Sequence, residues 1–232
     1  MAARHVIRAV TVDALGTLVH MQPPGPRLRV RLKALAGVDV SEEQAAAGFA
    51  AEIHYYLEHH LEGGDPASLD ALRDRCAGVL RATLGIEDVE LGVVREAMLG
   101  SLHFDAFADA APALEELRSR GLRLVAASNW DSSLPEVLER TGLASLLDGV
   151  VSSAAAGAAK PAPALFEAAL ELAGVQASEA IHVGDSVEKD VQGALALGMG
   201  AVLVERDGDA RAGGAAPVIS TLAELPPLVL DG

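Results

Sequence analysis

Residues 8–18 read RAVTVDALGTL, and this stretch decides the fold. The run over residues 8–14 is almost unbroken in apolar side chains and rich in valine, as expected for a strand buried inside a parallel sheet. Gly16 and Thr17 then break the strand, and Asp13 stands near its carboxyl end. We therefore predict the first strand of an α/β domain, with an acidic side chain where such sheets bind their ligands.

Beyond Asp105, helical and extended patterns alternate along the chain. Glycines at 121, 142, 174 and 198 stand where helix C-caps are expected. The predicted helices are 111–120, 134–141, 163–173 and 191–197, and the predicted strands are 122–127, 149–152, 180–183 and 201–204. This alternation predicts a Rossmann-like parallel sheet with helices on both faces. Residues 208–217 are rich in glycine and alanine and are expected to form a mobile loop.

The stretch between the first strand and this alternating part has a different pattern. Residues 21–26 (MQPPGP) are expected to be a linker, because three prolines and a glycine continue neither a helix nor a strand. From about residue 27 to 101, apolar residues recur three and four apart, as in EEQAAAGFAAEIHYYLEHHL, which is typical of amphipathic helices. We predict an α/β core formed by residues 1–20 and 106–232, interrupted by an all-helical domain at 21–105.

Composition limits the classes of function. Half of the 232 residues are apolar, which suits a packed globule, and the net charge of −15 with no basic run argues against a nucleic-acid partner. Cys76 is the one cysteine, so an intrachain disulfide is excluded and a reducing cytoplasm fits. The N-terminal apolar run is too short for a signal peptide, and no stretch suggests a membrane span. A soluble cytoplasmic protein is expected; its oligomeric state is not predicted.

Polar residues collect at the predicted strand ends. The carboxyl ends of parallel strands share one edge of a sheet, where ligands bind. Asp13, Ser128, Asn129 and Asp185 fall at or just after such ends in this chain. Lys160 starts the helical stretch that follows the strand at 149–152, and Asp190 lies five residues after Asp185. Each is ordinary alone, since an aspartate or serine often caps a helix and a lysine often lies on the surface. Their agreement in position predicts one functional site.

The residues around these positions resemble the four motifs of the haloacid dehalogenase superfamily. The matching stretches are DALGTL at 13–18, SN at 128–129, KP at 160–161 and GDSVEKD at 184–190. The helical insert begins where that superfamily carries its first type of cap domain, so the resemblance covers the whole chain. The stretches SNWDSSL and HVGDSVEKDVQGALALGM look most like the rhythmically-expressed-gene-2-like branch, whose substrates are largely unassigned.

This resemblance implies a magnesium-dependent hydrolase acting on a small phosphorylated substrate through an aspartyl-phosphate at Asp13. Magnesium would reduce the repulsion between that carboxylate and the phosphate. Its implied ligands are Asp13, the backbone carbonyl of Leu15, Asp185 and Asp190, the last either directly or by orienting the others. Lys160 would neutralise the phosphate oxygens, with Ser128, Asn129 and Thr17 in the substrate site.

One position departs from the phosphatase pattern. Most phosphatases of this superfamily carry a second aspartate, which protonates the leaving oxygen, where this chain has Leu15. Leucine cannot move a proton, and such catalysis contributes typically ~10²–10⁴-fold. A slow phosphatase is expected, or one limited to leaving groups that depart unprotonated, such as acyl or aryl phosphates. His20 and His54 are the candidates for a replacement acid.

Three alternatives follow from the same departure. True 2-haloacid dehalogenases also lack an acid at that position, but they need no magnesium and typically lack the Gly184-Asp185 pair. A phosphonate-cleaving relative would need a cap lysine, and Lys33 is the one lysine of the insert. A non-catalytic binding protein would have no reason to keep this set of charged residues. Phosphate chemistry is therefore favoured over each of these.

Two further features of the sequence have a structural and a functional interpretation. His54, His59 and His60 lie near Glu52, Glu58 and Glu62, which suggests a transition-metal site, although a solvated helix face is the commoner cause of such a cluster. Trp130, beside Asn129, is compatible with a place in the substrate pocket or with packing alone.

Overall fold

The structure of the protein is a computed structural model, and it describes residues 6–206 and 216–230. Contacts divide it into two units, residues 1–20 with 106–232 and residues 21–105. The loop expected at 208–217 lies mostly outside the described residues. Among those residues, the helices include none that is both long enough and apolar enough to cross a bilayer.

The first unit is built on a parallel sheet whose central strand is β1 (Ala9–Val12). All four residues of β1 are buried, and the strand pairs with β4 on one side and with β6 on the other. In spatial order the sheet contains β5 (Gly149–Ser152), β4 (Arg123–Ser128), β1, β6 (Ala180–Gly184), β7 (Gly200–Val204) and β8 (Val218–Ile219). This strand order is that of a doubly wound, Rossmann-like sheet. The predicted Rossmann-like parallel sheet is therefore confirmed.

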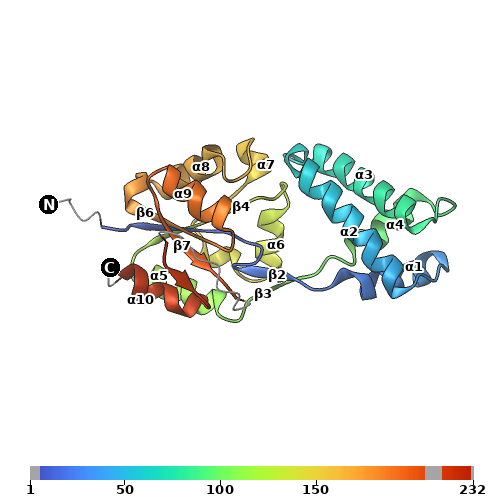
Figure 1. The fold of residues 1–232 in the computed structure, drawn as a ribbon, viewed down its shortest axis with the longest axis horizontal. Helices are drawn as coiled ribbons and strands as arrows, with labels where there is room; N and C mark the ends of the chain where they lie inside the picture. The colour runs from blue at the N-terminus through green and yellow to red at the C-terminus, as the bar shows by residue number, and fades with distance from the viewer. Residues whose placement is uncertain (1–5, 207–215, 231–232) are drawn as a thin grey trace. The chain divides into compact units, whose positions relative to one another are not determined.

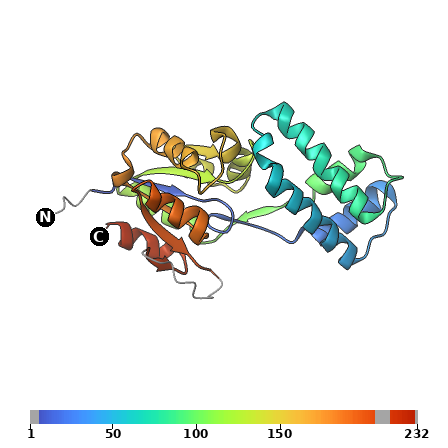
Figure 2. The same cartoon turned by 45° about the horizontal axis from the view of Figure 1, so that its top comes forward.

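Helices lie on both faces of this sheet (Figures 1 and 2). The α-helices of the first unit are α5 (Ala110–Ser119), α6 (Leu134–Arg140), α7 (Ser153–Ala156), α8 (Pro163–Ala173), α9 (Gly193–Ala196) and α10 (Leu225–Leu230). The short turns are η2 (Ala144–Leu146), η3 (Ala177–Glu179), η4 (Val187–Gln192) and η5 (Leu222–Glu224). Helix α8 shows how the sequence sets these bounds: a proline suits its first turn, and Gly174 ends it at φ +69°.

The second unit is a helical bundle. Its helices are α1 (Pro24–Ala36), α2 (Glu42–His59), α3 (Pro66–Leu84) and α4 (Leu91–Leu99), with the turn η1 (His60–Glu62) after α2. Apolar side chains from all four α-helices form one core, and a Cβ on Gly48 of α2 would lie 2.9 Å from Leu80 of α3. That close approach explains a glycine in the middle of α2.

Both chain crossings between the units pass through a short strand. These strands, β2 (Val19–Met21) and β3 (Phe104–Ala106), pair with each other in a two-stranded sheet. Neither strand was predicted, because three residues are too few for a period-2 pattern to stand out.

Two predictions were wrong by more than a shift of one or two residues at the end of an element. Residues 21–26 were expected to be linker throughout, whereas α1 begins at Pro24. Proline has no amide hydrogen to lose in the first turn of a helix, so it starts α1 rather than preventing it. A single helix was expected at 191–197, whereas the chain forms the wider turn η4 from Val187 and then α9. That wider turn serves the site described next.

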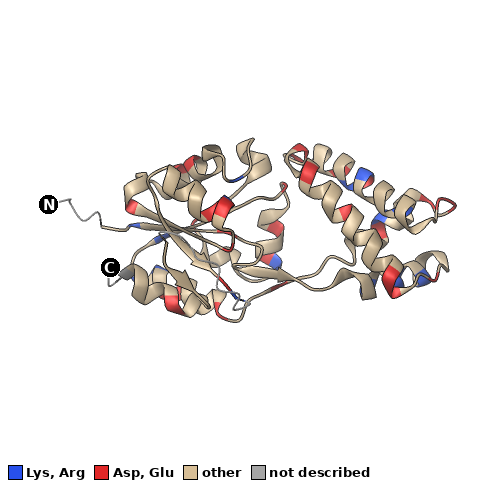
Figure 3. Ribbon diagram, in the orientation of Figure 1, with Lys and Arg blue, Asp and Glu red and all other residues tan. Residues whose placement is uncertain are grey.

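Charged side chains are distributed over both units. Figure 3 shows lysine and arginine scattered among aspartate and glutamate on the helices. This agrees with a sequence that has no basic run and a net charge of −15.

Candidate active site

The loop that follows β1 begins at Asp13. The Asp13 amide donates to the carbonyl oxygen of Val183 in β6 at 2.8 Å. Asp13 therefore lies at the edge of the sheet where β1 and β6 end. The chain then turns back sharply, with the Gly16 amide bonded to the Val19 carbonyl at 2.8 Å. Gly16 has φ +84°, and a Cβ there would lie 2.2 Å from an oxygen of Asp185. Glycine is therefore required at position 16 for two independent reasons.

Lys160 joins two carboxylates of the site. Its Nζ lies 2.6 Å from an oxygen of Asp13 and 2.6 Å from an oxygen of Asp190. It also donates to the carbonyl of Ala127 at 2.9 Å, at the end of β4. All three charged side chains are at most 9 % exposed. A buried charge requires a partner of opposite sign, and here one ammonium group serves two carboxylates.

Ionisation in this cluster is strongly perturbed. Burial favours the neutral amine of Lys160, but Asp13 and Asp190 together raise its pKa above the ordinary value. Burial also opposes ionisation of Asp190, yet its contacts with Lys160 and His182 hold the pKa of Asp190 well below its usual range. For Asp13, burial is the largest influence and raises the pKa, with the charge of Asp190 adding to the rise and Lys160 opposing it.

Asp185 lies at the solvent side of the cluster, at the end of β6. Its side chain is exposed, and its pKa is raised to about 6 by desolvation first and then by the negative charges of Asp13 and Asp190. Solvent contact moderates both effects. A carboxylate crowded by two others in this way is one that a nearby cation would stabilise in its charged form.

The donor set fits a magnesium ion. Asp13, Asp185 and Asp190 each offer an oxygen, and these three oxygens lie within 4.8 Å of one another. Hard carboxylate oxygens are the ligands that Mg²⁺ prefers. When ionised, the three carboxylates with Lys160 carry a formal charge of −2, which a divalent cation balances. Among the described residues, no other group of three acidic, histidine or cysteine side chains converges in this way.

The turn η4 explains how Asp190 reaches the site. The amides of Asp190 and Val191 both donate to the Ser186 carbonyl, at 3.0 and 3.2 Å, so the turn is one residue wider than in an α-helix. In return the Ser186 amide donates to the Asp190 carboxylate at 2.9 Å. A Cβ on Gly184 would lie 2.2 Å from the Asp190 carboxyl carbon, so that position requires glycine as well.

The predicted substrate-binding residues lie around the same loop but have different contacts. Ser128 ends β4, is buried, and acts to lower the pKa of the Asp13 carboxyl, against the effect of burial. Thr17 is fully buried, and its hydroxyl has no hydrogen-bond partner among the described residues. The Asn129 amide group is bonded to the backbone of Lys160, accepting from its N–H at 2.7 Å and donating to its carbonyl at 3.1 Å. These contacts indicate that Asn129 positions Lys160, while its predicted substrate contact stays a prediction.

Two buried residues behind Asp190 were not singled out from the sequence. His182 Nε2 lies 3.1 Å from an Asp190 oxygen, and His182 Nδ1 lies 2.8 Å from the hydroxyl of Thr11. The imidazole also packs against the edge of Phe166, and its pKa is lowered, chiefly by burial. A histidine inside the otherwise apolar strand AIHVG was the sequence signal that could have revealed it.

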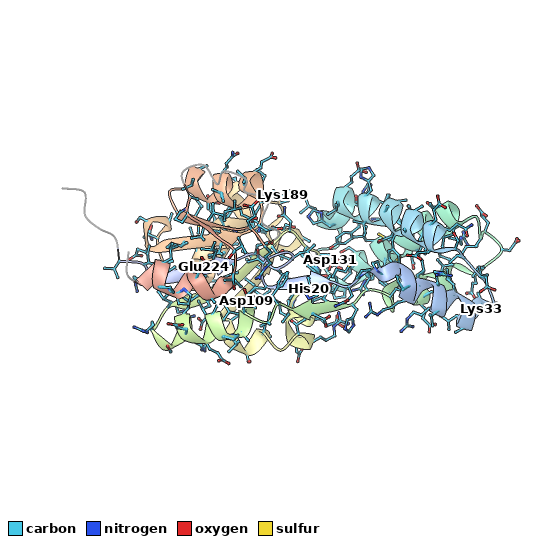
Figure 4. The ribbon with its side chains drawn as sticks, turned by 60° about the horizontal axis from the view of Figure 1, so that its bottom comes forward. His20, Lys33, Asp109, Asp131, Lys189 and Glu224 are labelled. Atoms are coloured by element: carbon cyan, nitrogen blue, oxygen red, sulfur yellow. The ribbon has the colours of Figure 1, made fainter. Side chains whose placement is uncertain are left out.

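The other candidates lie apart from this cluster in their contacts. His54 is exposed and pairs with Glu58 at 3.5 Å, His59 pairs with Glu62, and Lys33, exposed on α1 (Figure 4), pairs with Asp39. The face around the three histidines is not wholly solvated, because His60 and Glu52 are buried.

Trp130 and His20 lie in the first unit, where packing contacts surround both. Trp130 is 7 % exposed and donates from its ring nitrogen to Ser133 at 3.3 Å. The His20 ring lies 4.9 Å from that of Phe107. These contacts favour packing over the pocket for Trp130, and no described contact links His20 with Asp13.

Comparisons with known proteins agree on one family. The sequence model described as haloacid dehalogenase-like hydrolase matches residues 7–198. Phosphatase MT3486 of Mycobacterium tuberculosis is 38 % identical over 151 residues, which cover 62 % of this chain and 67 % of that protein.

Two solved structures are similar over nearly the whole chain. The HAD phosphatase of Thermococcus onnurineus has a TM-score of 0.68 and 25 % identity, and the match covers 97 % of this chain and 98 % of that one. The 2-haloacid dehalogenase of Pseudomonas syringae has a TM-score of 0.67 and 24 % identity over the same shares of the two chains. The second likeness shows the fold alone.

Proposed function

The chain belongs to the haloacid dehalogenase-like hydrolase family, and from this premise we propose that it is a magnesium-dependent phosphatase with Asp13 as its nucleophile. The observation that carries the proposal is the convergence of Asp13, Asp185 and Asp190 around one point, with Lys160 beside them. The phosphatase relative in Mycobacterium tuberculosis supports the same chemistry.

The bound ion would be held by Asp13, Asp185, Asp190 and the backbone carbonyl of Leu15, and it would supply positive charge next to the transferred phosphoryl group. Asp13 attacks phosphorus through one carboxylate oxygen as the P–O bond to the leaving group breaks, so that an aspartyl-phosphate forms and the leaving group departs as an anion. Water then hydrolyses the aspartyl-phosphate, which releases inorganic phosphate and restores the Asp13 carboxylate. Lys160 places its ammonium group beside the attacking carboxylate and offsets the charge of the phosphoryl oxygens. Asn129 holds the backbone of Lys160, and Ser128 orients the Asp13 carboxylate.

Position 15 limits the substrate. Leu15 is 44 % exposed and has no group that can protonate a leaving oxygen. A leaving group that is stable as an anion needs no such proton, which favours acyl phosphates and aryl phosphates over alkyl phosphate esters. We therefore propose a small metabolite carrying an activated phosphate as the substrate class.

A 2-haloacid dehalogenase is the second candidate, since it also needs no acid at position 15. Against it stands Asp185: its exposed carboxylate crowds Asp13 and Asp190, an arrangement that a cation would stabilise and that attack on a neutral carbon does not require. A binding protein without catalysis likewise gives no account of a nucleophile held next to a buried lysine.

The test is phosphate release from acetyl phosphate and p-nitrophenyl phosphate, with Mg²⁺ or with EDTA, in the wild type and in Asp13→Asn. We expect turnover that requires both Mg²⁺ and Asp13. Asp88→Asn, at an exposed carboxylate of the helical unit, is the matched control and should retain wild-type turnover. Turnover that persists in Asp13→Asn would overturn the assigned nucleophile.

Absence of turnover with both compounds would overturn the phosphatase proposal. Chloride release from 2-chloropropionate in EDTA would then support the dehalogenase. Absence of that release as well would support the binding protein.

A further inference from the structure

Arg206, just after β7, contacts the loop that carries Asp13. Its guanidinium group donates from Nε to the Gly16 carbonyl at 3.2 Å and from Nη2 to the Thr17 carbonyl at 2.7 Å. The contacts run to backbone oxygens, which any sequence in the loop would offer. Arg206 was therefore not recognisable from the motifs, although the loop it holds belongs to the first of them.

The guanidinium is held on its other sides as well. Asp109 accepts from it twice, at 3.0 and 3.2 Å, and the ring of Phe107 lies 3.6 Å from its central carbon. Four hydrogen bonds and one stacked ring fix the plane of the group, an arrangement that a lysine cannot reproduce. The Arg206 side chain is therefore held in one orientation by these contacts.

The Asp109 carboxylate that orients Arg206 is itself held by several hydrogen bonds. Asp109 stands at the N-cap of α5, yet it makes no side-chain bond to that helix. Instead the Asp109 side chain, labelled in Figure 4, accepts from the Thr221 hydroxyl at 2.5 Å and from the Leu222 amide at 2.8 Å. Burial opposes its ionisation, but the hydrogen bonds from Arg206, Thr221 and Leu222 together lower its pKa. The carboxylate therefore stays charged and oriented toward Arg206.

Hydrogen bonds hold the peptide groups on both sides of Gly16, and Arg206 supplies one of them. The Gly16 amide is fixed by the Val19 carbonyl, which orients the peptide unit that contains the Leu15 carbonyl. The Gly16 carbonyl is fixed by Arg206, and together these two bonds hold the residue at φ +84°. The loop passes against Asp185 at this residue, where a Cβ would clash with the carboxylate.

We propose that Arg206, oriented by Asp109, is a positioning residue that holds the Asp13–Leu18 loop in the geometry that the metal and the nucleophile require. The part that concerns metal and catalysis rests on the proposed function. The part that concerns the loop stands on the hydrogen bonds alone.

The test uses full-length Arg206→Lys and Asp109→Asn, with Arg123→Lys as the control. Arg123 is an arginine of the same unit that pairs with Asp148 at 2.8 Å, and among the described residues no hydrogen bond or ion pair given for its side chain reaches the loop. Hydrogen exchange of the amides at 16–19 is measured first, since it needs no activity. We expect exchange at least about tenfold faster in both variants, with strand β1 and the control unchanged.

Calorimetric titration with Mg²⁺ and steady-state kinetics follow on the same proteins. We expect weaker Mg²⁺ binding, and a turnover number roughly 10- to 100-fold lower with KM little changed. Unchanged exchange at 16–19 together with unchanged Mg²⁺ affinity in Arg206→Lys would overturn the inference. A wild type without phosphatase turnover would instead overturn the proposed function, and exchange and titration would still decide the role of Arg206.

Discussion

At position 15, the backbone and the side chain have different roles in the proposed site. The loop around Leu15 needs only a backbone carbonyl there, so the proposed metal site does not depend on the side chain. Protonation of a leaving oxygen does depend on it, and leucine offers no acid. Under the proposed function, leucine at position 15 would therefore leave metal binding intact while restricting which bonds can be cleaved.

Leu15→Asp tests this separation. We expect faster release of phosphate from an unactivated alkyl ester, by up to ~10²–10⁴-fold, because an acid would then stand beside the leaving oxygen. Acetyl phosphate, whose leaving group departs as an anion, should gain little and serves as the internal control. A folded variant that gains on neither compound would contradict the account of position 15.

Lys160 is the residue on which the buried charges depend most. In Lys160→Met, Asp13 and Asp190 would remain buried beside each other without a counter-charge. We expect the free energy of unfolding in EDTA to fall by about 3–5 kcal/mol, as for other broken buried pairs, and Mg²⁺ to restore part of the loss. Denaturant unfolding measures both effects.

Lys189→Met is the matched control for this variant, since Lys189 is exposed on η4 (Figure 4). Its unfolding should coincide with that of the wild type. Equal stability of Lys160→Met and the wild type in EDTA would mean that the ion pairs contribute nothing measurable.

At the scale of elements, the ends of three neighbouring strands, β4, β1 and β6, each supply a part of the site. The end of β1 supplies Asp13, β4 supplies Ser128 and a carbonyl for Lys160, and β6 supplies Asp185. The turn η4 brings Asp190 back to the same place, because widening the turn directs its carboxylate toward the Ser186 amide.

Helix α2 contains a buried acid that the site does not use. Glu52 is 5 % exposed, and burial raises its pKa from the ordinary 4.5, with a weak opposing hydrogen bond from Cys76. A raised folded-state pKa means that this group's stabilising contribution is complete below pH 4.5 and is lost as the pH rises through the folded value. At neutral pH the buried carboxylate therefore destabilises α2 packing.

Glu52→Gln removes that charge while keeping the shape. We expect the midpoint of thermal unfolding to rise at pH 7.5 by roughly 2–4 °C, which corresponds to about 1 kcal/mol in a chain of this size. The difference should vanish near pH 4.5 and below. Glu58→Gln, at an exposed position of the same helix, should show no such pH-dependent gain. An equal gain at both pH values would contradict the role of ionisation.

At the scale of the whole molecule, the protein has a net charge of −15 and is expected to act on anions. The local charge of Lys160 and of a bound cation acts within a few ångströms, whereas the surrounding acidity repels an approaching phosphate. Salt screens the long-range repulsion by the acidic surface more than the local attraction by Lys160 and a cation, because the Debye length is about 8 Å at physiological ionic strength.

Raising the salt concentration should therefore help substrate binding. At saturating Mg²⁺, we expect KM for p-nitrophenyl phosphate to fall by about twofold between low salt and about 0.15 M NaCl, with the turnover number unchanged. Steady-state kinetics over a salt series measures this. A KM that rises with salt would indicate that the entrance to the site is locally positive despite the overall charge.

The sequence by itself determined the class of fold and the residues of the candidate site. Strand β5 and helix α8 were predicted with the bounds that the structure has, because buried valine runs and a proline-to-glycine helix frame are local signals. Four of the site residues were recognisable for a related reason, because each ends its own strand or directly follows it: Asp13, Ser128, Asn129 and Asp185.

Only the tertiary structure decided how those residues act on one another. Asn129 holds the backbone of Lys160, His182 meets the hydroxyl of Thr11, and Arg206 fixes the carbonyls of the Asp13 loop, and each of these contacts joins residues far apart in the chain. A local pattern records whether a residue suits a helix, a strand or a turn, and it carries no information on which distant backbone oxygen a side chain will meet. Long-range hydrogen bonds depend on strand order and register, which exist only once the sheet has formed.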